Sequence, residues 1–366
     1  MEKKIFVICG EPSGELRASE LVKALKNINP EIKISAIGSK LLKDSGAEIF
    51  FDINGLSVMG FFDVLKSLPK FFNLKKLILN KISLEKPDAI ILVDFSGFNL
   101  RLAKAINNSI PTIYYVSPQV WASRPGRIKI IKKYIKKMIV IFKFEQDFYR
   151  KFKIEAVFVG HPLIDIIKPI YQEKTKTTIA LLPGSRKQEI KRILPIMLES
   201  VKLIKGEMDA QFVIAKSPGV AKEIYLDIIK DTNIDLKILE DKTYEAVSSS
   251  DFALVCSGTA TLETAIIGKP FAIVYKTSLL NYLLYRPLVK VPFIGIVNII
   301  AGKEIIPEFI QFNARPRKIA DFTVSALRNP AQLQLIKEDL AKIKSLLGQP
   351  GAANRAAGII IDFLKI

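Results

Sequence analysis

The chain has 366 residues, 49% of them hydrophobic, and a formal net charge of +19. This length favours two domains, and this composition excludes a disordered chain. A single histidine and two cysteines, Cys9 and Cys256 in apolar runs, exclude a disulfide framework and histidine-rich metal sites. The excess of lysine and arginine fits nucleic acid, an anionic membrane or phosphorylated substrates, so charge alone does not identify a partner.

No uncharged stretch reaches the length of a membrane-spanning helix. The N-terminal run Ile5–Cys9 is too short for a signal peptide and predicts a first strand. The loop after it, Gly10–Glu15, has small residues but matches neither the GxGxxG pattern nor a P-loop. We therefore expect no dinucleotide or ATP site of those kinds and no cofactor. The two cysteines in apolar runs indicate a protein of a reducing compartment.

Short apolar runs alternate with helical patterns along the first half of the chain. This alternation predicts a parallel, doubly wound sheet with helices on both faces. The runs that predict strands cover residues 5–9, 34–37, 89–93, 112–116 and 138–142.

Aromatic side chains and lysines crowd the segment Leu56–Leu79, which Pro69 is expected to divide into two helical pieces. Two interpretations remain open. The segment is a pair of core helices, which is the commoner case, or it is a basic, aromatic face that lies on a membrane or holds acyl chains. The candidate acceptor, acyl or membrane contacts are Met59, Phe61, Phe62, Phe71 and Phe72.

An acidic residue, Asp94, closes the expected strand Ala89–Val93. Open α/β sheets bind their ligands at the carboxyl ends of the strands, and an acid there can act as a general base. The alternative is that Asp94 caps the helix expected around Leu100–Ile106.

Between Arg124 and Lys153 the chain has eleven basic and two acidic residues. Many of these bases alternate with isoleucine, as on the solvated faces of ordinary elements. A cationic face toward anionic lipid explains them at least as well as nucleic acid does, because no nucleic-acid-binding motif accompanies them. Further on, His161 at a strand end is a catalytic candidate, although a local hydrogen-bonding role is commoner.

The second half repeats the pattern of the first after a linker over residues 166–176. Its first strand leads into a helix that opens near Arg186, beside Gly184 and Ser185. An arginine at a helix start is a candidate clamp for a diphosphate. The expected strands cover residues 178–182, 212–215, 252–255 and 271–275.

A strand–turn–helix junction follows Val255. The turn Ser257–Thr259 supplies hydroxyls and a flexible backbone, and the following helix is expected to end at Gly268. Backbone N–H groups and the helix dipole at such a junction bind phosphate, and Glu263, one turn further, can reach the hydroxyls of an attached ribose. The alternative is an ordinary junction with a Ser/Thr cap and no ligand.

The apolar segment over residues 279–300 is interrupted by Arg286, Pro287, Lys290 and Pro292. These interruptions exclude a membrane span and leave a docking surface as the interpretation.

Two Rossmann-like α/β domains, each with a strand–loop–helix anion site, suggest a cleft between them, which is the layout of a GT-B glycosyltransferase. There is no Asp-x-Asp pair. This absence disfavours a metal-bound diphosphate and favours neutralisation by Arg186, backbone N–H groups and the helix dipole. The expected division is an acceptor-binding domain over residues 1–168, a nucleotide-sugar-binding domain over residues 177–345, and a C-terminal helix over residues 351–366.

Five motifs in the chain together resemble lipid-A-disaccharide synthase, from Gly10 to beyond Gln311. Each motif is weak alone, but their number and order are specific. They are Tyr115–Trp121 (YVSPQVW), Phe158–Leu163 (FVGHPL), Leu182–Arg186 (LPGSR), Ser257–Glu263 (SGTATLE) and the segment Val291–Glu308.

The resemblance implies an inverting hexosyltransferase of lipid A and lipopolysaccharide biosynthesis. Such an enzyme joins UDP-2,3-diacylglucosamine to 2,3-diacylglucosamine 1-phosphate (lipid X) through a β-1,6 bond and releases UDP. It would work at the cytoplasmic face of the inner membrane as a peripheral protein. The implied partners are UDP-diacylglucosamine, lipid X and an anionic membrane surface, with a homodimer as a further option and no nucleic acid.

The resemblance also implies roles for individual residues. Asp94 would deprotonate the acceptor hydroxyl, and Glu15 is the second catalytic candidate. The UDP-binding candidates are Gly184, Ser185, Arg186, Ser257, Gly258, Thr259, Ala260, Thr261, Glu263, Asn298, Glu304, Glu308 and Gln311, without a metal.

The first loop departs from the family pattern Gly-Glu-x-Ser-Gly-Asp-x-His-Gly. Here Glu15 replaces Asp, Arg17 replaces His and Ala18 replaces Gly. Ser96 also stands where a proline is usual, and Ser123 where a second tryptophan is usual. The donor motifs are intact, so we expect an active enzyme.

Two other functions are compatible with parts of the sequence. A UDP-N-acetylglucosamine epimerase or another UDP-sugar transferase would share the architecture. An epimerase needs paired acids and a histidine in the cleft, and the single histidine of this chain argues against that function. A basic protein that binds nucleic acid or membrane would show salt-dependent binding to oligonucleotides and no UDP binding.

Overall fold

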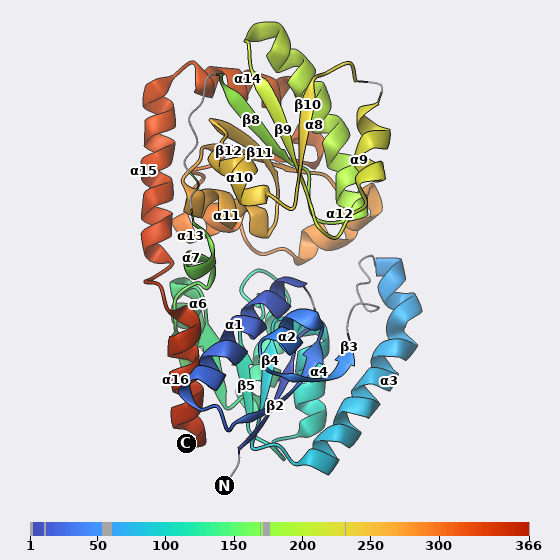
Figure 1. Ribbon diagram of the computed structural model, residues 1–366, viewed down its shortest axis with the longest axis vertical. Helices are drawn as coiled ribbons and strands as arrows, with labels where there is room; N and C mark the ends of the chain where they lie inside the picture. The colour runs from blue at the N-terminus through green and yellow to red at the C-terminus, as the bar shows by residue number, and fades with distance from the viewer. Residues whose placement is uncertain are drawn as a thin grey trace. The chain divides into compact units, whose positions relative to one another are not determined.

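The computed structural model describes residues 3–10, 12–52, 61–168, 170, 176–230 and 232–365, with the backbone alone for residues 12, 61–70 and 285 (Figure 1). The chain divides into two compact units, Met1–Pro162 with Leu347–Ile366, and Leu163–Leu346. Each unit is built on a parallel sheet, so the predicted α/β class with two doubly wound domains is confirmed.

The first unit has a seven-stranded sheet in the order β3-β2-β1-β4-β5-β6-β7. The central strand β4 is buried along its whole length, because an apolar run covered by helices on both faces leaves no residue for solvent. The strands are β1 (Lys4–Ile8), β2 (Lys33–Gly38), β3 (Glu48–Asp52), β4 (Ala89–Val93), β5 (Thr112–Tyr115), β6 (Lys137–Val140) and β7 (Ala156–Phe158).

Apart from α6, the helices of the first unit form two groups. One group is α1 with α2 and α16, and the other is α4 with α3 and α5. Right-handed crossovers in a sheet whose strand order reverses place such groups on opposite faces. The helices are α1 (Pro12–Ile28), α2 (Lys40–Asp44), α3 (Phe61–Glu85), α4 (Ser96–Ile106), α5 (Ile128–Tyr134), α6 (Lys143–Arg150) and α16 (Ala352–Leu364).

The expectation that Pro69 divides the Phe-rich segment is wrong, because α3 runs from Phe61 to Glu85 without a break. A proline removes one backbone donor from a helix, and a long helix survives this loss where packing holds it. Leu74, Ile78 and Ile82 supply that packing, since their spacing of four residues buries one stripe of α3.

The second unit has a six-stranded sheet in the order β10-β9-β8-β11-β12-β13. Its strands are β8 (Thr178–Leu182), β9 (Gln211–Lys216), β10 (Leu236–Glu240), β11 (Phe252–Cys256), β12 (Phe271–Tyr275) and β13 (Glu308–Ile310). Its helices are α7 (Leu163–Ile166), α8 (Lys187–Glu207), α9 (Lys222–Ile229), α10 (Thr243–Ser248), α11 (Thr259–Ile267), α12 (Leu279–Tyr285), α13 (Ile296–Ala301), α14 (Pro316–Leu327) and α15 (Pro330–Leu346). As predicted, Gly268 ends α11, with φ of 82°.

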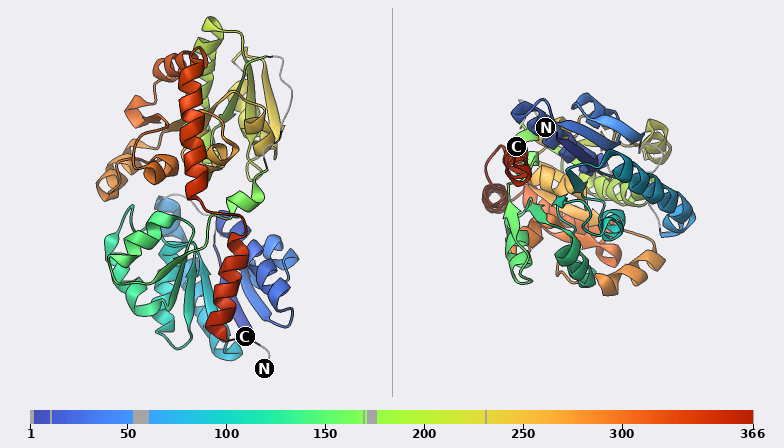
Figure 2. Two further views of the ribbon diagram at one scale, coloured as in Figure 1. Left: turned by 90° about the vertical axis from the view of Figure 1, so that its left-hand side faces the viewer. Right: turned by 90° about the horizontal axis from the view of Figure 1, so that it is seen from below.

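The C-terminal helix α16 belongs to the first unit. It lies along α1 (Figures 1 and 2). Arg355 fixes its start by donating to the carbonyls of Val159, Gln349 and Pro350. The chain passes from the first unit to the second between Pro162 and Leu163, slightly before the linker expected from the sequence. Helix α7 belongs to the second unit because it packs against α11 of that unit.

Two absences and two free thiols characterise the described ranges. No helix there is long and apolar enough to cross a membrane. No cluster of His, Cys, Asp or Glu there has the number of ligands that holds a metal ion. Cys9 and Cys256 are buried free thiols, as predicted.

Candidate active site

The strand order of the first sheet reverses between β1 and β4. In open parallel sheets, ligands bind outside the carboxyl ends of the strands at such a switch point. Two segments meet at this position. They are the loop from Gly10 into α1, which follows β1, and the turn at Asp94, which follows β4.

Asp94 lies in a strained and well-supported turn. Asp94 and Phe95 have φ of 49° and 45°, in the left-handed region that few residues other than glycine adopt. Asn99 Nδ2 donates to the Asp94 carbonyl over 2.9 Å, and the Tyr114 hydroxyl donates to it over 2.5 Å. Strain of this kind persists where surrounding contacts impose it, and it clusters at functional sites. The N-cap of α4 is Phe95, so Asp94 does not cap this helix.

Arg17 lies beside Asp94, with Nη1 3.5 Å from Oδ2, and 31% of the Asp94 side chain is exposed. Burial raises the pKa of the Asp94 carboxyl, and the Arg17 charge and the Phe95 N–H oppose this shift. A carboxylate with raised proton affinity and one open side is suited to accept a proton from a bound hydroxyl.

Two glycines allow the first loop to approach this turn. A Cβ at Gly10 would clash with the Phe95 ring, and a Cβ at Gly14 would lie 3.4 Å from Cβ of Asp94. A side chain at Gly10 would therefore displace the Phe95 ring from this turn.

The catalytic role expected for Glu15 stays a prediction, and the contacts of its side chain lie within the protein. Its side chain is 6% exposed, and its two oxygens accept from the Ser39 N–H over 2.5 Å and the Ser39 hydroxyl over 2.8 Å. Each oxygen therefore has a hydrogen-bond partner within the protein. Glu15 joins the start of α1 to the turn between β2 and α2, which is a structural role.

Of the five expected acyl or membrane contacts, Phe71 and Phe72 have described side chains. Phe71 packs against Phe95 and Phe98, with ring centroids 6.0 and 6.1 Å apart, so it supports the Asp94 turn from α3. Phe72 is 65% exposed and has Lys75 near its ring. Met59 lies outside the described residues, and the side chains of Phe61 and Phe62 are also outside them.

A buried polar cluster that the sequence analysis did not single out lies at the carboxyl ends of β5 and β6. Glu145 is 2% exposed and accepts hydrogen bonds from the Ser117 hydroxyl, the Trp121 indole and the Phe142 N–H. Burial raises the pKa of Glu145 to about 7, against the effect of these hydrogen bonds. The Phe142 ring lies 5.0 Å from the ring of His161, which is itself buried. This cluster orders the loop that carries the Tyr115–Trp121 motif.

Glu145 makes stability depend on pH in a definite direction. Its folded-state pKa is above the ordinary 4.5, so folding favours the protonated form. The resulting stabilisation is complete below about pH 4.5, and about 3 kcal/mol of it is lost as pH rises to about 7. Urea midpoints at about pH 5 and about pH 8 should therefore differ less for Glu145→Gln than for the natural chain. Glu155→Gln, an exposed control, should keep the natural pH dependence, and an equal dependence in Glu145→Gln would contradict the assignment.

In the second unit, the strand order reverses between β8 and β11, and the two predicted phosphate-binding segments meet there. Gly184 and Ser185 follow β8, Arg186 is the N-cap of α8, and Ser257 and Gly258 follow β11. A Cβ at Gly184 would lie 3.3 Å from Sγ of Cys256, so the two segments are in contact.

The start of α8 is held by Glu189. Its Oε2 accepts from the Ser185 N–H over 3.2 Å, and its Oε1 accepts from Arg186 Nη1 over 3.1 Å. Gly184 has φ of 121°, and a Cβ there would lie 2.7 Å from Glu189 Oε2, so glycine is required. A carboxylate thus occupies donors of the kind that a diphosphate would use.

The start of α11 is open. Gly258 is its N-cap, and a Cβ at Gly258 would meet no atom of the described residues within 4 Å. The first N–H groups of a helix have no partner within it and attract an anion, and Thr259 and Ala260 are the first two residues of α11. Thr261 already donates, through its N–H and its hydroxyl, to the Gly258 carbonyl, so its side chain shapes the turn. Glu263 accepts from the Tyr244 hydroxyl over 3.2 Å.

Asn298 and Glu308 were expected near the donor. Their side chains form hydrogen bonds mainly with backbone groups around them. Asn298 is fully buried and exchanges hydrogen bonds with Ile305 and Ile306. Glu308 accepts from Asn298 Nδ2 and from the N–H groups of Ile294 and Gly295, each over 2.9 Å. The Ile294 carbonyl in turn accepts from the Ser257 hydroxyl. These residues therefore support the Ser257 turn from behind.

Glu304 and Gln311 have similar local partners. Glu304 accepts from the Glu308 N–H over 3.2 Å. Gln311, which is 6% exposed, accepts from the Thr277 N–H and donates to the Thr277 carbonyl. It holds the loop after β12 to the end of β13.

Replacing Asn298 by Ala should lower the free energy of unfolding by about 3 kcal/mol, because it leaves buried backbone groups of Ile305 and Ile306 without their partner. Urea unfolding followed by circular dichroism measures the change. The exposed Asn313→Ala is the control, with an expected effect below about 0.5 kcal/mol. Equal shifts in the two variants would mean that the Asn298 network does not stabilise this unit.

Comparison with known proteins decides the family. Residues 5–361 match the family model described as Lipid-A-disaccharide synthetase. A lipid-A-disaccharide synthase of Syntrophus aciditrophicus is 38% identical over 99% of this chain and 98% of the relative. The chain belongs to this family. The predicted family and the predicted enzyme class, a hexosyltransferase, are thereby confirmed.

Solved structures similar to this lipid-A-disaccharide synthetase family member share its two-domain fold. One is the glycotransferase of kitacinnamycin, with a TM-score of 0.66, 14% identity and 98% of each chain covered. Another is a UDP-GlcNAc 2-epimerase from Neisseria meningitidis bound to UDP-GlcNAc, with a TM-score of 0.65, 14% identity and 99% of each chain covered. At this identity the likeness concerns the fold alone.

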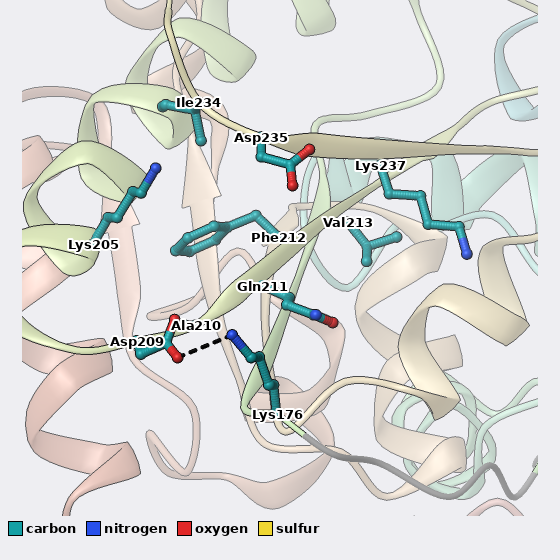
Figure 3. A pocket seen from close by; sticks show the side chains of 10 residues that line it. All are labelled: Lys176, Lys205, Asp209, Ala210, Gln211, Phe212, Val213, Ile234, Asp235 and Lys237. Carbon is teal, nitrogen blue, oxygen red and sulfur yellow. Dashed lines mark ion pairs between the residues drawn. The ribbon is translucent and has the colours of Figure 1, made fainter.

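One cavity in the second unit lies away from the point where the strand order of its sheet reverses. A cavity of about 550 Å³ in the second unit is lined by side chains that include Lys176, Gln211 and Lys237 (Figure 3). Lys176 precedes β8 and Gln211 begins β9, so the cavity lies at the amino ends of the strands. Because parallel sheets bind ligands at the opposite edge, we do not assign it to the active site.

Proposed function

We propose that the chain transfers diacylglucosamine from UDP-2,3-diacylglucosamine to the 6-hydroxyl of 2,3-diacylglucosamine 1-phosphate, with inversion at the anomeric carbon. The observation that carries this proposal is the position of the candidate site residues. The Asp94 turn lies at the switch point of one sheet, and the Arg186 and Ser257 turns lie at the switch point of the other. Family membership supports the same reaction class.

Asp94 is the general base of the proposed reaction. The acceptor hydroxyl loses its proton to the Asp94 carboxylate, and its oxygen forms a bond to the anomeric carbon. The bond from that carbon to the diphosphate oxygen breaks, and UDP leaves with the electron pair. The support is the fixed backbone of Asp94, its partly open side and the burial that raises its pKa.

Charge that develops on the departing diphosphate is stabilised in the second unit. Arg186, the Ser185 N–H and the first N–H groups of α11 supply positive potential at one sheet edge. Arg186 is 48% exposed on its side chain and can turn from Glu189 to a phosphate. Glu263, on the same helix, is the proposed ribose contact, as the family resemblance implies.

The acceptor carries acyl chains, so the proposed enzyme works at an anionic membrane surface on the cytoplasmic side. Helix α3 supports this part, because Phe72, Leu77 and Leu84 are 65%, 46% and 83% exposed. Lysines lie between these side chains, as on interfacial helices.

Product analysis tests the proposal. The purified chain is incubated with both lipid substrates, and the product is examined by mass spectrometry and by the proton coupling constant at the new anomeric centre. A disaccharide 1-phosphate with a β-1,6 bond is expected. An α bond would contradict inversion, and a product joined at another hydroxyl would contradict the assigned acceptor position.

A further inference from the structure

Helix α12 of the second unit presents its apolar side chains to solvent. Leu279, Leu280, Leu283 and Leu284 are 55%, 51%, 61% and 46% exposed. The polar Asn281 and Tyr282 on the same helix are only partly exposed. Surface helices normally turn the apolar face inward. Here the orientation is reversed. The leucines occur in two pairs, each four residues apart, so they form one stripe that faces solvent.

Neighbouring side chains extend this stripe. Leu288, just after α12, is 43% exposed, and Phe312 is 65% exposed. The Tyr282 ring meets the Phe312 ring edge to face, with centroids 5.9 Å apart. Together with the four leucines of α12, these residues form what we call the leucine patch. It consists of Leu279, Leu280, Leu283, Leu284, Leu288 and Phe312. Contiguous exposed apolar surface of this kind marks a contact with another molecule or a membrane.

The leucine patch is surrounded by positive charge. Between Glu263 and Glu304 the sequence has no acidic residue and five basic ones. Three of these, Lys276, Arg286 and Lys290, flank the leucines and are exposed. Within the described part of the chain, none of the three forms an ion pair with an acid, so their charge is available to a partner.

We propose that the leucine patch and its basic rim dock on an anionic phospholipid bilayer. Interfacial elements bury leucine and phenylalanine at the boundary of the acyl chains and place lysine and arginine at anionic headgroups. A second copy of the chain fits less well, because a two-fold contact would bring one basic rim against the other. This surface deepens the proposed membrane contact of the enzyme and rests on the proposed function for the need of a bilayer.

Flotation with vesicles tests the proposal without any sugar substrate. The probes are vesicles of neutral phosphatidylcholine, with or without about a third of anionic phosphatidylglycerol. The double variant Leu280→Ser/Leu283→Ser should bind anionic vesicles at least about tenfold more weakly than the natural chain. Arg286→Gln/Lys290→Gln should weaken binding by about fivefold per charge removed, and added salt should have less effect on it.

A matched control lies on α15. Leu335 and Leu346 are 63% and 48% exposed, outside the leucine patch. The double variant Leu335→Ser/Leu346→Ser should bind vesicles as the natural chain does. If the leucine-patch variant also binds as the natural chain does, the proposal is overturned, even where transferase activity is intact. If the natural chain binds neutral and anionic vesicles equally, the role of the basic rim is overturned.

A direct measurement of insertion separates docking from a general loss of affinity. A Leu283→Cys variant carrying an environment-sensitive fluorophore should shift its emission to the blue with anionic vesicles, and a labelled Leu335→Cys variant should not. The native thiols Cys9 and Cys256 are buried and should not compete for the label. No shift at residue 283, or a shift that appears without lipid as the protein concentration rises, would overturn a bilayer as the occupant.

Discussion

Replacing Asp94 by Asn is expected to lower kcat by about 100- to 10,000-fold, the usual contribution of a general base. Asn keeps the size of the side chain and can still accept from the Phe95 N–H, but it cannot take the acceptor proton. The supports of the turn act on the Asp94 carbonyl, through Asn99 and Tyr114, so they survive the substitution. Affinity for UDP should stay within about twofold, because the proposed UDP site belongs to the other unit.

Asp88→Asn is the matched control for this variant. Asp88 precedes the same strand at its opposite end, where it accepts from the Lys4 N–H and pairs with Lys3. It should lose stability and keep its turnover. A loss of UDP affinity as large as the loss of kcat in Asp94→Asn would contradict the role of Asp94 as base. A kcat close to the natural value would do the same.

Replacing Arg186 by Ala is expected to weaken UDP binding by about 30- to 100-fold, since a charged hydrogen bond to a phosphate contributes roughly 2 to 3 kcal/mol. Titration calorimetry with UDP measures the effect. In this variant the Glu189 carboxylate loses its partner and stays beside the Ser185 N–H. Its repulsion of a diphosphate adds to the loss of the arginine.

The double variant Arg186→Ala/Glu189→Gln separates these two contributions. Removing the negative charge should restore part of the affinity, and the remaining deficit belongs to Arg186. Lys202→Ala, which removes an exposed cation further along α8, is the matched control and should bind UDP as the natural chain does. Unchanged UDP affinity in Arg186→Ala would mean that the diphosphate does not bind at the switch point of the second sheet.

The sequence predicts the inner strands of both sheets and misses strands at their edges. The strands β3, β10 and β13 were not expected, and each is an edge strand in its sheet. An inner strand is covered on both sides and shows a continuous apolar run, as β4 and β11 do. An edge strand is only partly buried, so its sequence mixes polar and apolar residues and gives no such run.

Motif matching locates the site better than it assigns roles within it. Asn298, Glu308 and Gln311 lie where the resemblance places donor contacts, but their polar atoms bind backbone groups. Sequence alone does not distinguish a side chain that touches a ligand from one that holds the loop behind it. Glu145 was missed for a related reason. Its partners Ser117 and Trp121 are distant in sequence, and only the fold brings them to it.

Acceptor-dependent release of UDP tests the central claim most directly. The purified chain is given UDP-2,3-diacylglucosamine with and without 2,3-diacylglucosamine 1-phosphate, and free UDP is measured over time. Release that requires the acceptor is the predicted result. Release at the same rate without the acceptor, or no release from a chain that binds UDP, would contradict the proposed transfer.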